Sequence, residues 1–436
     1  MPMAANRAAW LGSDEALQAI AAIAAAPLRR GHHVRVLRDG GLAFPAMLAL
    51  IRAAKRSVCF ENFIFAGDET GAEFARALEA ARARGAEVRV LYDPLGTMLV
   101  KGGSIRRRLR DSAVHVRSFR PLSMVSPWSW LRLRHRDHRK LLLGDDLAAV
   151  VGGLCIADHW APAERGGGGW RDTALLVRGP AVADLQLAFE RMWRRAVELV
   201  PETLRPTHQL PVATLPKERG DASVIVVGDR PRTQRVAALY RWLAEHAQES
   251  FEISDAYFVA PPSVLAALIA AARRGVRVRL LAPGRTNHPI AGLAARRIYE
   301  PLLAAGCEIH EWSGVMLHAK TAVVDGVISL SARATSIRSR CTATSNSISW
   351  WGVPRPVPRC ATCSSPTSRR PTRSSSRSGG GVPGSPRWPR RQLRCSPGTC
   401  SGDASTQVVT TGCLRQVGAL EVRGGGRYIP PHFREV

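Results

Sequence analysis

Hydrophobic positions in the first 326 residues follow helical and strand patterns in turn. The stretch 77–94 reads ALEAARARGAEVRVLYDP, and the stretch 267–283 reads ALIAAARRGVRVRLLAP. In each stretch a helix with apolar periodicity is closed by a glycine, Gly85 or Gly275, and is followed by a strand rich in β-branched residues. The two stretches therefore form a repeat with an offset of 190 residues.

Matching segments also lie on either side of this repeat. Upstream, the predicted strands SVCFENFIF around Glu61 and FEISDAYFV around Asp255 combine aromatic residues with an acidic one. Downstream, a short apolar strand that carries His and Lys follows in both halves. Strands that alternate with helices predict an α/β fold, with a mixed or mostly parallel sheet covered by helices in each half. We interpret the repeat as the duplication of one domain.

The length of the chain indicates more than one domain, since 436 residues exceed the roughly 250–300 that one hydrophobic core supports. We expect an N-terminal helical segment at 1–32, followed by a first α/β half at 33–200. A Pro-rich linker is expected at 201–217, and a second, incomplete half at 218–330. The remaining residues, 331–436, are expected to form a disordered tail.

Charge is strongly positive and unevenly distributed. The net charge of +27 favours an anionic partner, such as phospholipid head groups or nucleic acid. After Gly326, however, the sequence contains seventeen Arg, no Lys and only three acidic residues. Six of the nine Cys also fall in this stretch. The three Cys before it suggest a reducing compartment rather than a disulfide framework.

Two short motifs carry the candidate chemistry. Residues 138–145 and 318–325 both read H-x-K-x-x-x-x-D, and they contain two of the five Lys of the chain. Alternation along a strand places His and Lys on one face. An ammonium offers a point charge to a phosphoryl oxygen, and an imidazole can act as nucleophile or proton donor near neutral pH. The residues expected to act are His138, Lys140, Asp145, His318, Lys320 and Asp325.

Each motif by itself is compatible with an ordinary core histidine, but two motifs in identical settings favour a shared site. If the halves pack about a pseudo-two-fold axis, His138 and His318 meet across one phosphate. One imidazole then attacks phosphorus while the other protonates the leaving alkoxide.

Over residues 33–326 the sequence resembles the phospholipase D superfamily, and more closely its bacterial cardiolipin synthase branch. Beyond the two motifs, the resemblance is carried by Gly152-Gly153, residues 170–173, residues 177–182, residues 256–258 and residues 316–321. It implies catalysis through a phosphohistidine, with no cofactor and no metal. By analogy the nucleophile is His138 and the acid is His318, although pseudo-symmetry leaves the opposite order open.

The resemblance also implies supporting residues around the motifs. Asp172 is expected to pair with His318, which fixes the tautomer of the imidazole and favours its charged form. Cys155 departs from the pattern, because it stands where an Asn is common and a thiol is a weak hydrogen-bond donor. The supporting residues expected at the site are Asp172, Gly152, Gly153 and Glu61.

The resemblance stops shortly after the second motif. Ser, Arg, Pro and Cys then dominate, and the first interpretation is disorder. If 331–337 and 343–352 are encoded by GC-rich codons, regrouping them in another frame yields family-like segments. We therefore predict a frameshift between about Gly326 and Ser331, with a basic tail that binds nucleic acid as the alternative. The chain as written then lacks the acid expected to orient His138 and the strands that complete the second sheet, which predicts impaired activity.

Phosphatidyl transfer from an anionic, phosphatidylglycerol-like phospholipid to an alcohol acceptor is the first functional hypothesis. Trp128 and Trp130, in a basic insert before the first motif, suit an anionic bilayer interface or the packing of a core or lid. Phospholipid hydrolysis, nuclease activity of the same superfamily and a non-catalytic lipid-binding remnant are the alternatives. Nucleic acid is disfavoured, because no pattern of aromatic and basic residues marks a binding groove.

We expect the chain at the cytoplasmic side of the inner membrane, with peripheral contact. No apolar run in the sequence reaches the roughly 20 residues of a membrane-spanning helix. The N-terminal apolar stretch follows Asp14 and Glu15 rather than the basic cluster of a signal peptide.

Overall fold

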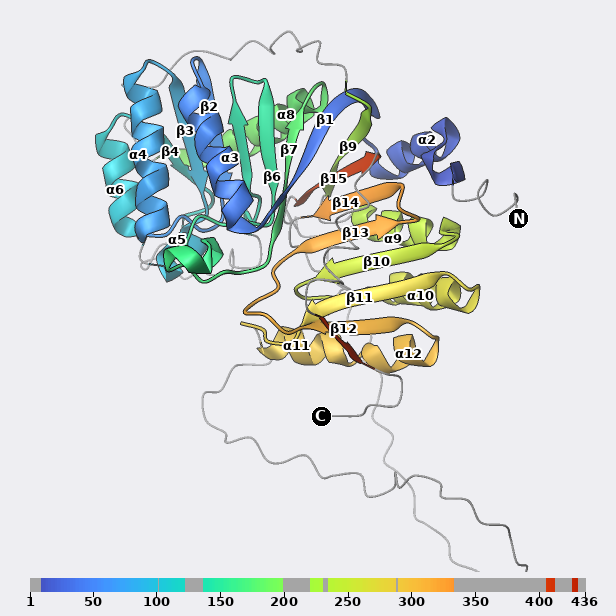
Figure 1. The fold of residues 1–436 in the computed structure, drawn as a ribbon. Helices are drawn as coiled ribbons and strands as arrows, with labels where there is room; N and C mark the ends of the chain where they lie inside the picture. Colours follow the sequence, from blue (N-terminus) through green and yellow to red (C-terminus); the bar gives the residue numbers. More distant parts are fainter. Residues whose placement is uncertain are drawn as a thin grey trace, which may run out of the picture. The chain divides into compact units, whose positions relative to one another are not determined.

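Strands and helices alternate through two similar halves, which are seen in Figure 1. The computed structural model describes residues 9–100, 102–121, 136–198, 220–229, 234–287, 289–332, 405–411 and 426–429. The first half has the strands β1 (Arg29–Arg38), β2 (Ser57–Asn62), β3 (Glu87–Tyr92), β4 (His115–Ser118), β5 (Leu141–Gly144), β6 (Ala148–Gly152), β7 (Thr173–Arg178) and β8 (Val197–Glu198). Its helices are α3 (Asp39–Ala53), α4 (Glu69–Ala83), α5 (Pro94–Leu99), α6 (Gly103–Asp111) and α8 (Ala181–Trp193), with the 3-10 turns η3 (Asp158–Trp160) and η4 (Ala163–Arg165).

The second half repeats this succession of elements. Its strands are β9 (Ala222–Asp229), β10 (Ser250–Asp255), β11 (Arg277–Pro283), β12 (Glu308–Trp312), β13 (Lys320–Val324), β14 (Ile328–Ala332), β15 (Ser405–Thr411) and β16 (Gly426–Ile429). Its helices are α9 (Arg235–His246), α10 (Pro262–Arg273), α11 (Pro289–Arg296) and α12 (Tyr299–Ala304). The 3-10 turn η1 (Ala9–Gly12) and the helix α2 (Asp14–Ala24) precede both halves.

The described strands form one sheet with internal symmetry. From the central pair outward, one side runs β1-β7-β6-β5-β2-β3-β4-β8 and the other runs β9-β15-β14-β13-β10-β11-β12-β16. In both halves three strands run parallel, namely β2-β3-β4 and β10-β11-β12. The strand inside each motif, β5 or β13, runs antiparallel to both of its neighbours. The mixed α/β fold predicted from the repeat is therefore confirmed.

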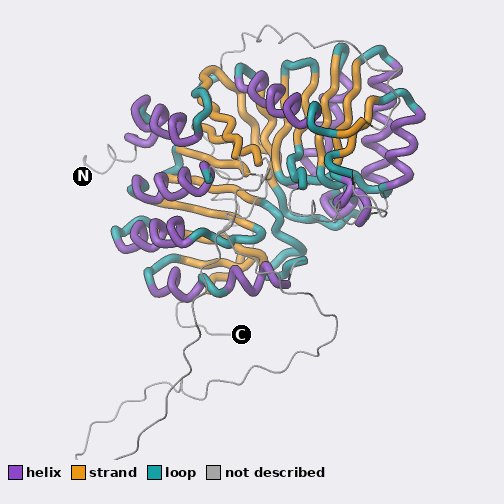
Figure 2. Tube along the Cα trace, turned by 180° about the vertical axis from the view of Figure 1, so that it is seen from behind, coloured by secondary structure: helices purple, strands orange, loops and turns teal. Residues whose placement is uncertain are grey.

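Helices cover each half and bury its apolar strand positions. In the first half α3, α4 and α6 cover one face, and Phe60 of β2 packs among their apolar side chains. The alternate residue Cys59 points to the other face, where α8 supplies Leu185 and Phe189. In the second half α9, α10 and α12 lie behind the strands in Figure 1 and in front of them in Figure 2. Helix α2 joins that second core through Ile20.

Local signals in the sequence set several helix ends. Gly85 and Gly275, which follow α4 and α10, have φ angles of 93° and 95°. Glycine adopts this left-handed conformation without steric cost, so the predicted ends of both helices are confirmed. At the start of α4, the carboxylate of Asp68 accepts a hydrogen bond from the backbone N–H of Gly71.

The tail corrects one expectation from the sequence. Residues 331–436 were expected to add no strand, yet β15 pairs with both β14 and β9, and β16 pairs with β12. Val408 and Val409 of β15 are buried, with exposed fractions of 0% and 1%. The short β-branched run around them gave no clear strand signal, because the surrounding sequence is rich in Ser and Arg. The edges of β9 and β14 form hydrogen bonds with its backbone groups.

Several predicted segments lie outside the described residues. These are the linker at 201–217, the tryptophan-containing insert before the first motif, and residues 333–404 of the predicted tail.

Candidate active site

The first motif leads into β5 from a short extended segment. His138 is partly exposed, and the ring of Phe63 stacks on its imidazole with 4.0 Å between the ring centroids. Lys140 is buried, and its Nζ donates a hydrogen bond of 3.1 Å to the carbonyl oxygen of His138. The same ammonium lies 5.4 Å from the centre of the Phe63 ring, within range of a cation–π interaction. These contacts hold His138 and Lys140 as one unit.

The second motif repeats this unit before β13. The ammonium of Lys320 donates to the carbonyl oxygen of His318, and it lies 5.4 Å from the centre of the Tyr257 ring. The Tyr257 ring also meets the His318 imidazole edge-on, with 6.2 Å between centroids. Lys320 is buried as Lys140 is. Both halves thus present a histidine held by its own lysine beside an aromatic ring.

A strand-like contact ties the first half to the second motif. The N–H of Arg171 donates to the carbonyl oxygen of Met316, and the N–H of His318 donates to the carbonyl oxygen of Arg171. These two bonds form a parallel bridge between Arg171 and Leu317. The residue after Arg171 is Asp172, and this bridge therefore places Asp172 next to His318.

Asp172 orients the imidazole of His318. Its Oδ2 lies 2.7 Å from Nδ1 of His318 and accepts a second hydrogen bond of 2.9 Å from Nε1 of Trp160. Its Oδ1 accepts from the N–H of Thr173 at 2.8 Å. The carboxylate is fully buried. With Nδ1 of His318 bound to Asp172, Nε2 is the ring nitrogen left to face a substrate.

Burial and charge set the protonation of this pair. Burial acts to raise the pKa of Asp172, but attraction to the charged form of His318, the hydrogen bond between the two side chains and the charge of Lys320 outweigh it and hold that pKa below its usual value. Burial lowers the pKa of His318 to about 4, and the charges of Lys320 and Lys140 add to this lowering against the attraction of Asp172. Burial and the two lysines therefore favour the neutral form of His318 in the free chain.

The charges of Lys140 and Lys320 influence the same group of titratable side chains. Burial lowers the pKa of Lys320 to about 8, and repulsion from Lys140 contributes, while Asp172 and Asp255 oppose the shift. Lys140 also acts on His318, as noted above. The charge of Lys140 thus lowers the pKa of both His318 and Lys320, so the two His-Lys units lie within electrostatic range of one another.

Asp145 and Asp325 are not brought to this site. The Asp145 carboxylate accepts hydrogen bonds from the N–H groups of Lys55, Arg56 and Ser57 at 2.7–2.9 Å. It follows β5, about 16 Å along the chain from Lys140 at about 3.3 Å per residue. Burial acts to raise the pKa of Asp145, but these three donors outweigh it and hold the pKa below its usual value.

Asp325 makes the same contacts in the second half. Its carboxylate accepts from the N–H groups of Gln248, Glu249 and Ser250, each at 2.8 Å. Like Asp145, it has a positive φ, here 50°. The final acid of each motif therefore fastens the start of β2 or β10 to the turn after β5 or β13.

Glu61 is also turned away from the site. Its carboxylate forms a buried ion pair with Arg139, with 2.5 Å between Oε1 and Nη2. Arg139 lies between His138 and Lys140 and, by strand alternation, faces the opposite side. The position that neighbours the lysine on β2 is Asn62, whose Oδ1 accepts from the N–H of Ile64 at 3.2 Å.

The glycine pair provides space for Asp172. A Cβ atom on Gly153 would lie 2.0 Å from Oδ1 of Asp172, and one on Gly152 would lie 2.4 Å from Cα of Ala174. The adjacent Cys155 is buried, and burial raises the pKa of its thiol while the charge of Lys140 opposes that shift. Cys155 thus lies beside Lys140, at the position where the family pattern has an Asn.

Sequence reasoning missed several residues of the site. Phe63, Tyr257 and Trp160 pack on the two histidines or on Asp172. The first two belong to the aromatic strand segments of the repeat, so an alignment of the halves would have found them. Trp160 gives no such signal, because its hydrogen bond to Asp172 depends on η3 folding back against β7.

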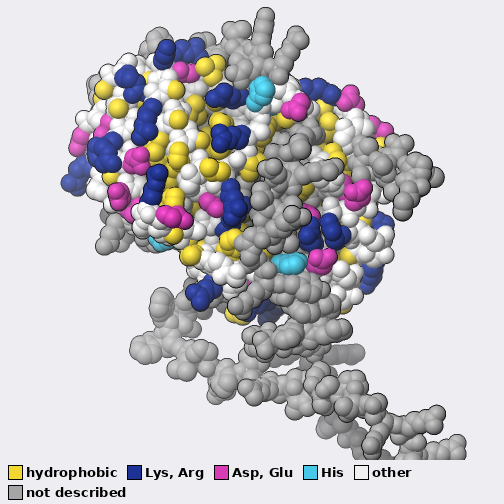
Figure 3. Space-filling model, in the orientation of Figure 1, with side chains coloured by type: hydrophobic (Ala, Val, Ile, Leu, Met, Phe, Trp, Pro, Cys, Tyr) yellow, Lys and Arg dark blue, Asp and Glu magenta, His cyan; other side chains and the backbone are white. Residues whose placement is uncertain are grey.

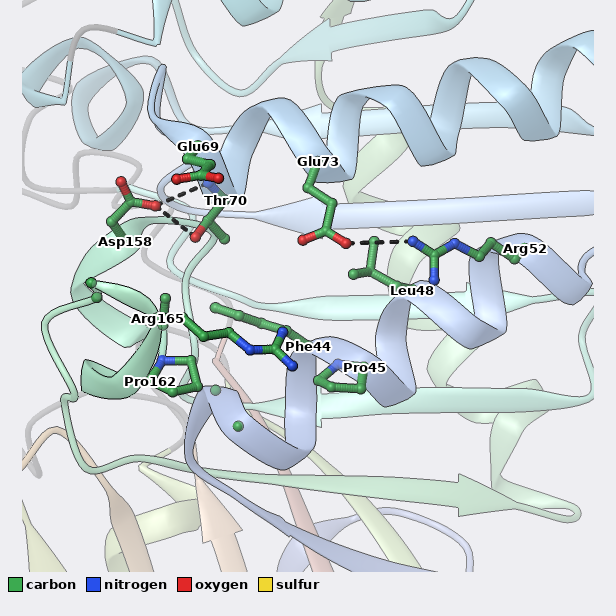
Figure 4. A pocket seen from close by; sticks show the side chains of 15 residues that line it. Phe44, Pro45, Leu48, Arg52, Glu69, Thr70, Glu73, Asp158, Pro162 and Arg165 are labelled. Carbon is green, nitrogen blue, oxygen red and sulfur yellow. Dashed lines mark hydrogen bonds and ion pairs between the residues drawn. The ribbon is translucent and has the colours of Figure 1, made fainter.

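A separate cavity of about 390 Å³ opens on the first half (Figure 4). It lies between α3, the start of α4 and residues 158–167. Asp158 accepts hydrogen bonds from N and Oγ1 of Thr70, and Arg52 pairs with Glu73 at 3.4 Å. No residue of either motif lines this cavity.

Comparisons with known proteins agree with the geometry. A domain family described as "Cardiolipin synthase, PLD-like domain" matches residues 241–344. The chain is 32% identical over 302 residues to a cardiolipin synthase of Halalkalibacterium halodurans, covering 69% of this chain and 59% of that protein. It is 31% identical over 295 residues to the major cardiolipin synthase of Bacillus subtilis, covering 68% and 60%. The crystal structure of phosphatidylserine synthase from Haemophilus influenzae has a similar fold, with a TM-score of 0.61, 12% identity and coverage of 94% and 91%.

The duplicated fold and its paired His-Lys units make this chain a member of the phospholipase D superfamily. Within that superfamily it is a cardiolipin synthase-like protein. The chain spans about three fifths of the length of these relatives. In the described part of the chain, no helix combines the length and apolar character needed to cross a membrane. The described residues also include no group of three His, Cys, Asp or Glu side chains placed to hold a metal ion.

Proposed function

We propose that the chain transfers a phosphatidyl group from an anionic phospholipid, such as phosphatidylglycerol, to an alcohol. The observation that carries this proposal is the contact of Asp172 with His318, together with a second His-Lys unit whose lysine acts electrostatically on the same imidazole. The similarity to cardiolipin synthases supports phospholipids as the substrate class. Hydrolysis of phospholipids and nuclease activity are not better supported by the comparisons.

The reaction proceeds in two displacements. An imidazole nitrogen of His138 attacks phosphorus, the bond from phosphorus to the leaving alkoxide breaks, and His318 donates a proton to that oxygen. The acceptor alcohol then gives its proton to His318 as its oxygen attacks the phosphohistidine, and the bond between nitrogen and phosphorus breaks. The two ammonium groups of Lys140 and Lys320 stabilise the charge that develops on the phosphoryl oxygens.

Substrate binding prepares His318 for its role as acid. In the free chain, the charges of Lys320 and Lys140 contribute to the low pKa of His318. A phosphodiester carries one negative charge, and bound between the lysines it offsets their repulsion. The pKa of His318 therefore rises when substrate binds, and Asp172 stabilises the imidazolium that results.

The protein meets its lipid as a peripheral membrane protein at the cytoplasmic side of the inner membrane. The insert with Trp128 and Trp130 is proposed to contact the bilayer, although it lies outside the described residues. Nucleic acid is a less suitable partner. Among the described residues on the face visible in Figure 3, Lys and Arg are interspersed with Asp and Glu and form no continuous basic surface.

The direct experiment supplies the purified chain with radiolabelled phosphatidylglycerol and, separately, with plasmid DNA. A labelled lipid product that depends on added alcohol supports transfer, and labelled phosphatidic acid alone indicates hydrolysis. Nicked plasmid without any lipid product would refute the proposal. A His138→Ala variant serves as the control for contaminating activity.

A further inference from the structure

The two His-Lys units are equivalent in their backbone but differ in the residue beside each lysine. In the first half the end of β2 carries Asn62, and in the second half the end of β10 carries Asp255. The equivalence is visible in their contacts: Asn62 accepts from the N–H of Ile64, and Asp255 accepts from the N–H of Tyr257. Both side chains are buried, with exposed fractions of 2% and 8%. A neutral amide in one half therefore occupies the place of a carboxylic acid in the other.

A second pair of equivalent positions also has an acidic residue on the side of Lys320 and a neutral residue on the side of Lys140. Across β6 and β7, Gly152 pairs with Ala174, and across β14 and β15, Ala332 pairs with Gln407. Ala174 and Gln407 are therefore equivalent positions in the two halves. The residues two positions before them, Asp172 and Ser405, are equivalent as well. The half with Lys320 is thus supplied with Asp172 and Asp255, whereas the half with Lys140 has Ser405 and Asn62 at the matching positions.

We propose that this difference polarises the site, with Asp255 and Asn62 as the positioning residues that set it. Asp255 compensates the charge of Lys320, while Asn62 leaves the charge of Lys140 uncompensated, so the anionic oxygen of the substrate phosphate binds at Lys140. The inference rests on the proposed function and adds to it a direction: phosphate is anchored on the side of His138, and proton transfer is kept on the side of His318.

Electrostatics around Lys320 agree with this assignment. The groups that act on it are Asp172, Asp255, Lys140 and Cys155. The pKa of Lys320 is lowered to about 8, chiefly by burial, and both carboxylates oppose that shift. The pKa of Asp255 is raised to about 6 by burial, against its hydrogen bond from Tyr257 and the charge of Lys320. Above pH 6 the carboxylate of Asp255 is therefore ionised and keeps Lys320 charged.

The first test follows the titration of Lys320 and needs no turnover. The chain has only five Lys, so isotope-labelled lysine gives few NMR signals, and a Lys320→Arg variant identifies the relevant one. Asp255→Asn removes a nearby opposite charge without changing the shape, and we expect the midpoint of Lys320 to fall by about one pH unit. Asn62→Asp is the matched control and should not lower that midpoint, because it adds a negative charge instead of removing one. An unchanged midpoint in Asp255→Asn would overturn the inference.

The second test measures binding of inorganic phosphate by calorimetry at pH 6.5. We expect Asn62→Asp to weaken binding about tenfold, because it adds a negative charge beside Lys140, and Asp255→Asn to strengthen it by a similar factor. Equal weakening in both variants would show general damage and would contradict the inference. The double variant restores the total charge, and a Lys320 midpoint in it equal to that of the unaltered chain would show that only total charge matters, which also overturns the inference.

The two tests separate this inference from the proposed function. If the unaltered chain binds no phosphate, the phosphate site of the proposed function is absent and the anchoring at Lys140 is refuted with it. If phosphate binds but is indifferent to Asn62→Asp, the proposed function stands and the polarity is wrong.

Discussion

Asp325 tests whether the last residue of the second motif stabilises the fold or takes part in the chemistry. The structure predicts that Asp325→Asn destabilises the fold and leaves the chemistry at Lys320 unchanged. In the unaltered chain the carboxylate accepts three backbone N–H groups at 2.8 Å: Glu249 and Ser250 at Oδ1, and Gln248 at Oδ2. The amide keeps Oδ1 as an acceptor but directs an NH₂ donor at the N–H of Gln248.

The expected cost follows from these contacts. One charge-assisted hydrogen bond is lost, which contributes about 1.5–3 kcal/mol, and one partly buried donor loses its acceptor, which costs about 1–3 kcal/mol. Because the two contributions overlap, we expect the free energy of unfolding to fall by about 2–4 kcal/mol. Asp145→Asn should cost a similar amount, since Asp145 binds Lys55, Arg56 and Ser57 in the same way.

Urea unfolding of the full chain, followed by circular dichroism, measures this loss. Asp14→Asn is the control, because the Asp14 side chain is 76% exposed and its pairing with Arg30 should contribute less than about 1 kcal/mol. Phosphate binding to the folded Asp325→Asn variant should match that of the unaltered chain. Unchanged stability combined with lost phosphate binding would place Asp325 in the chemistry and refute the reasoning.

Four further predictions follow from the site. Asp172→Asn should reduce phosphatidyl transfer by about 10²–10⁴-fold, because His318 loses the carboxylate that stabilises its charged form; a transfer assay with labelled lipid measures this, and near-normal rates would contradict the assigned role. Gly153→Ala should destabilise the chain by about 1–3 kcal/mol, since its Cβ would lie 2.0 Å from Oδ1 of Asp172; a urea midpoint equal to that of the unaltered chain would show that the carboxylate has room to move. Since the folded pKa of His318, about 4, lies below the unfolded value near 6.5, the unfolded chain binds the extra proton between these values. The contribution of His318 is therefore present above pH 6.5 and lost as the pH falls toward 4, and the difference in unfolding free energy from His318→Asn should decline over that window. Finally, sequencing the gene from about codon 320 to the stop should reveal a frameshift between about Gly326 and Ser331, and the frame-corrected chain should be more stable and more active; an intact frame would remove that prediction.

Much of the fold was determined by local patterns in the sequence. Helix periodicity and closing glycines identified α4 and α10, because a left-handed residue that ends a helix is read directly from Gly85 and Gly275. The repeat identified the duplication, and the shared motif identified His138, Lys140, His318 and Lys320. These features depend on residues close together in the chain, where spacing is sufficient to predict a shared face.

Tertiary structure decided which of the motif residues meet a substrate. Asp145 and Asp325 stand in the same motifs as the lysines, but each lies at the far end of its strand and binds backbone N–H groups there. Glu61 is next to Asn62 in sequence, yet strand alternation turns it toward Arg139 on the opposite face. The bond from Trp160 to Asp172 and the place of β15 between β9 and β14 depend on contacts between distant segments. No local pattern encodes such contacts, because they form only when separate strands and turns are brought to the same edge of the sheet.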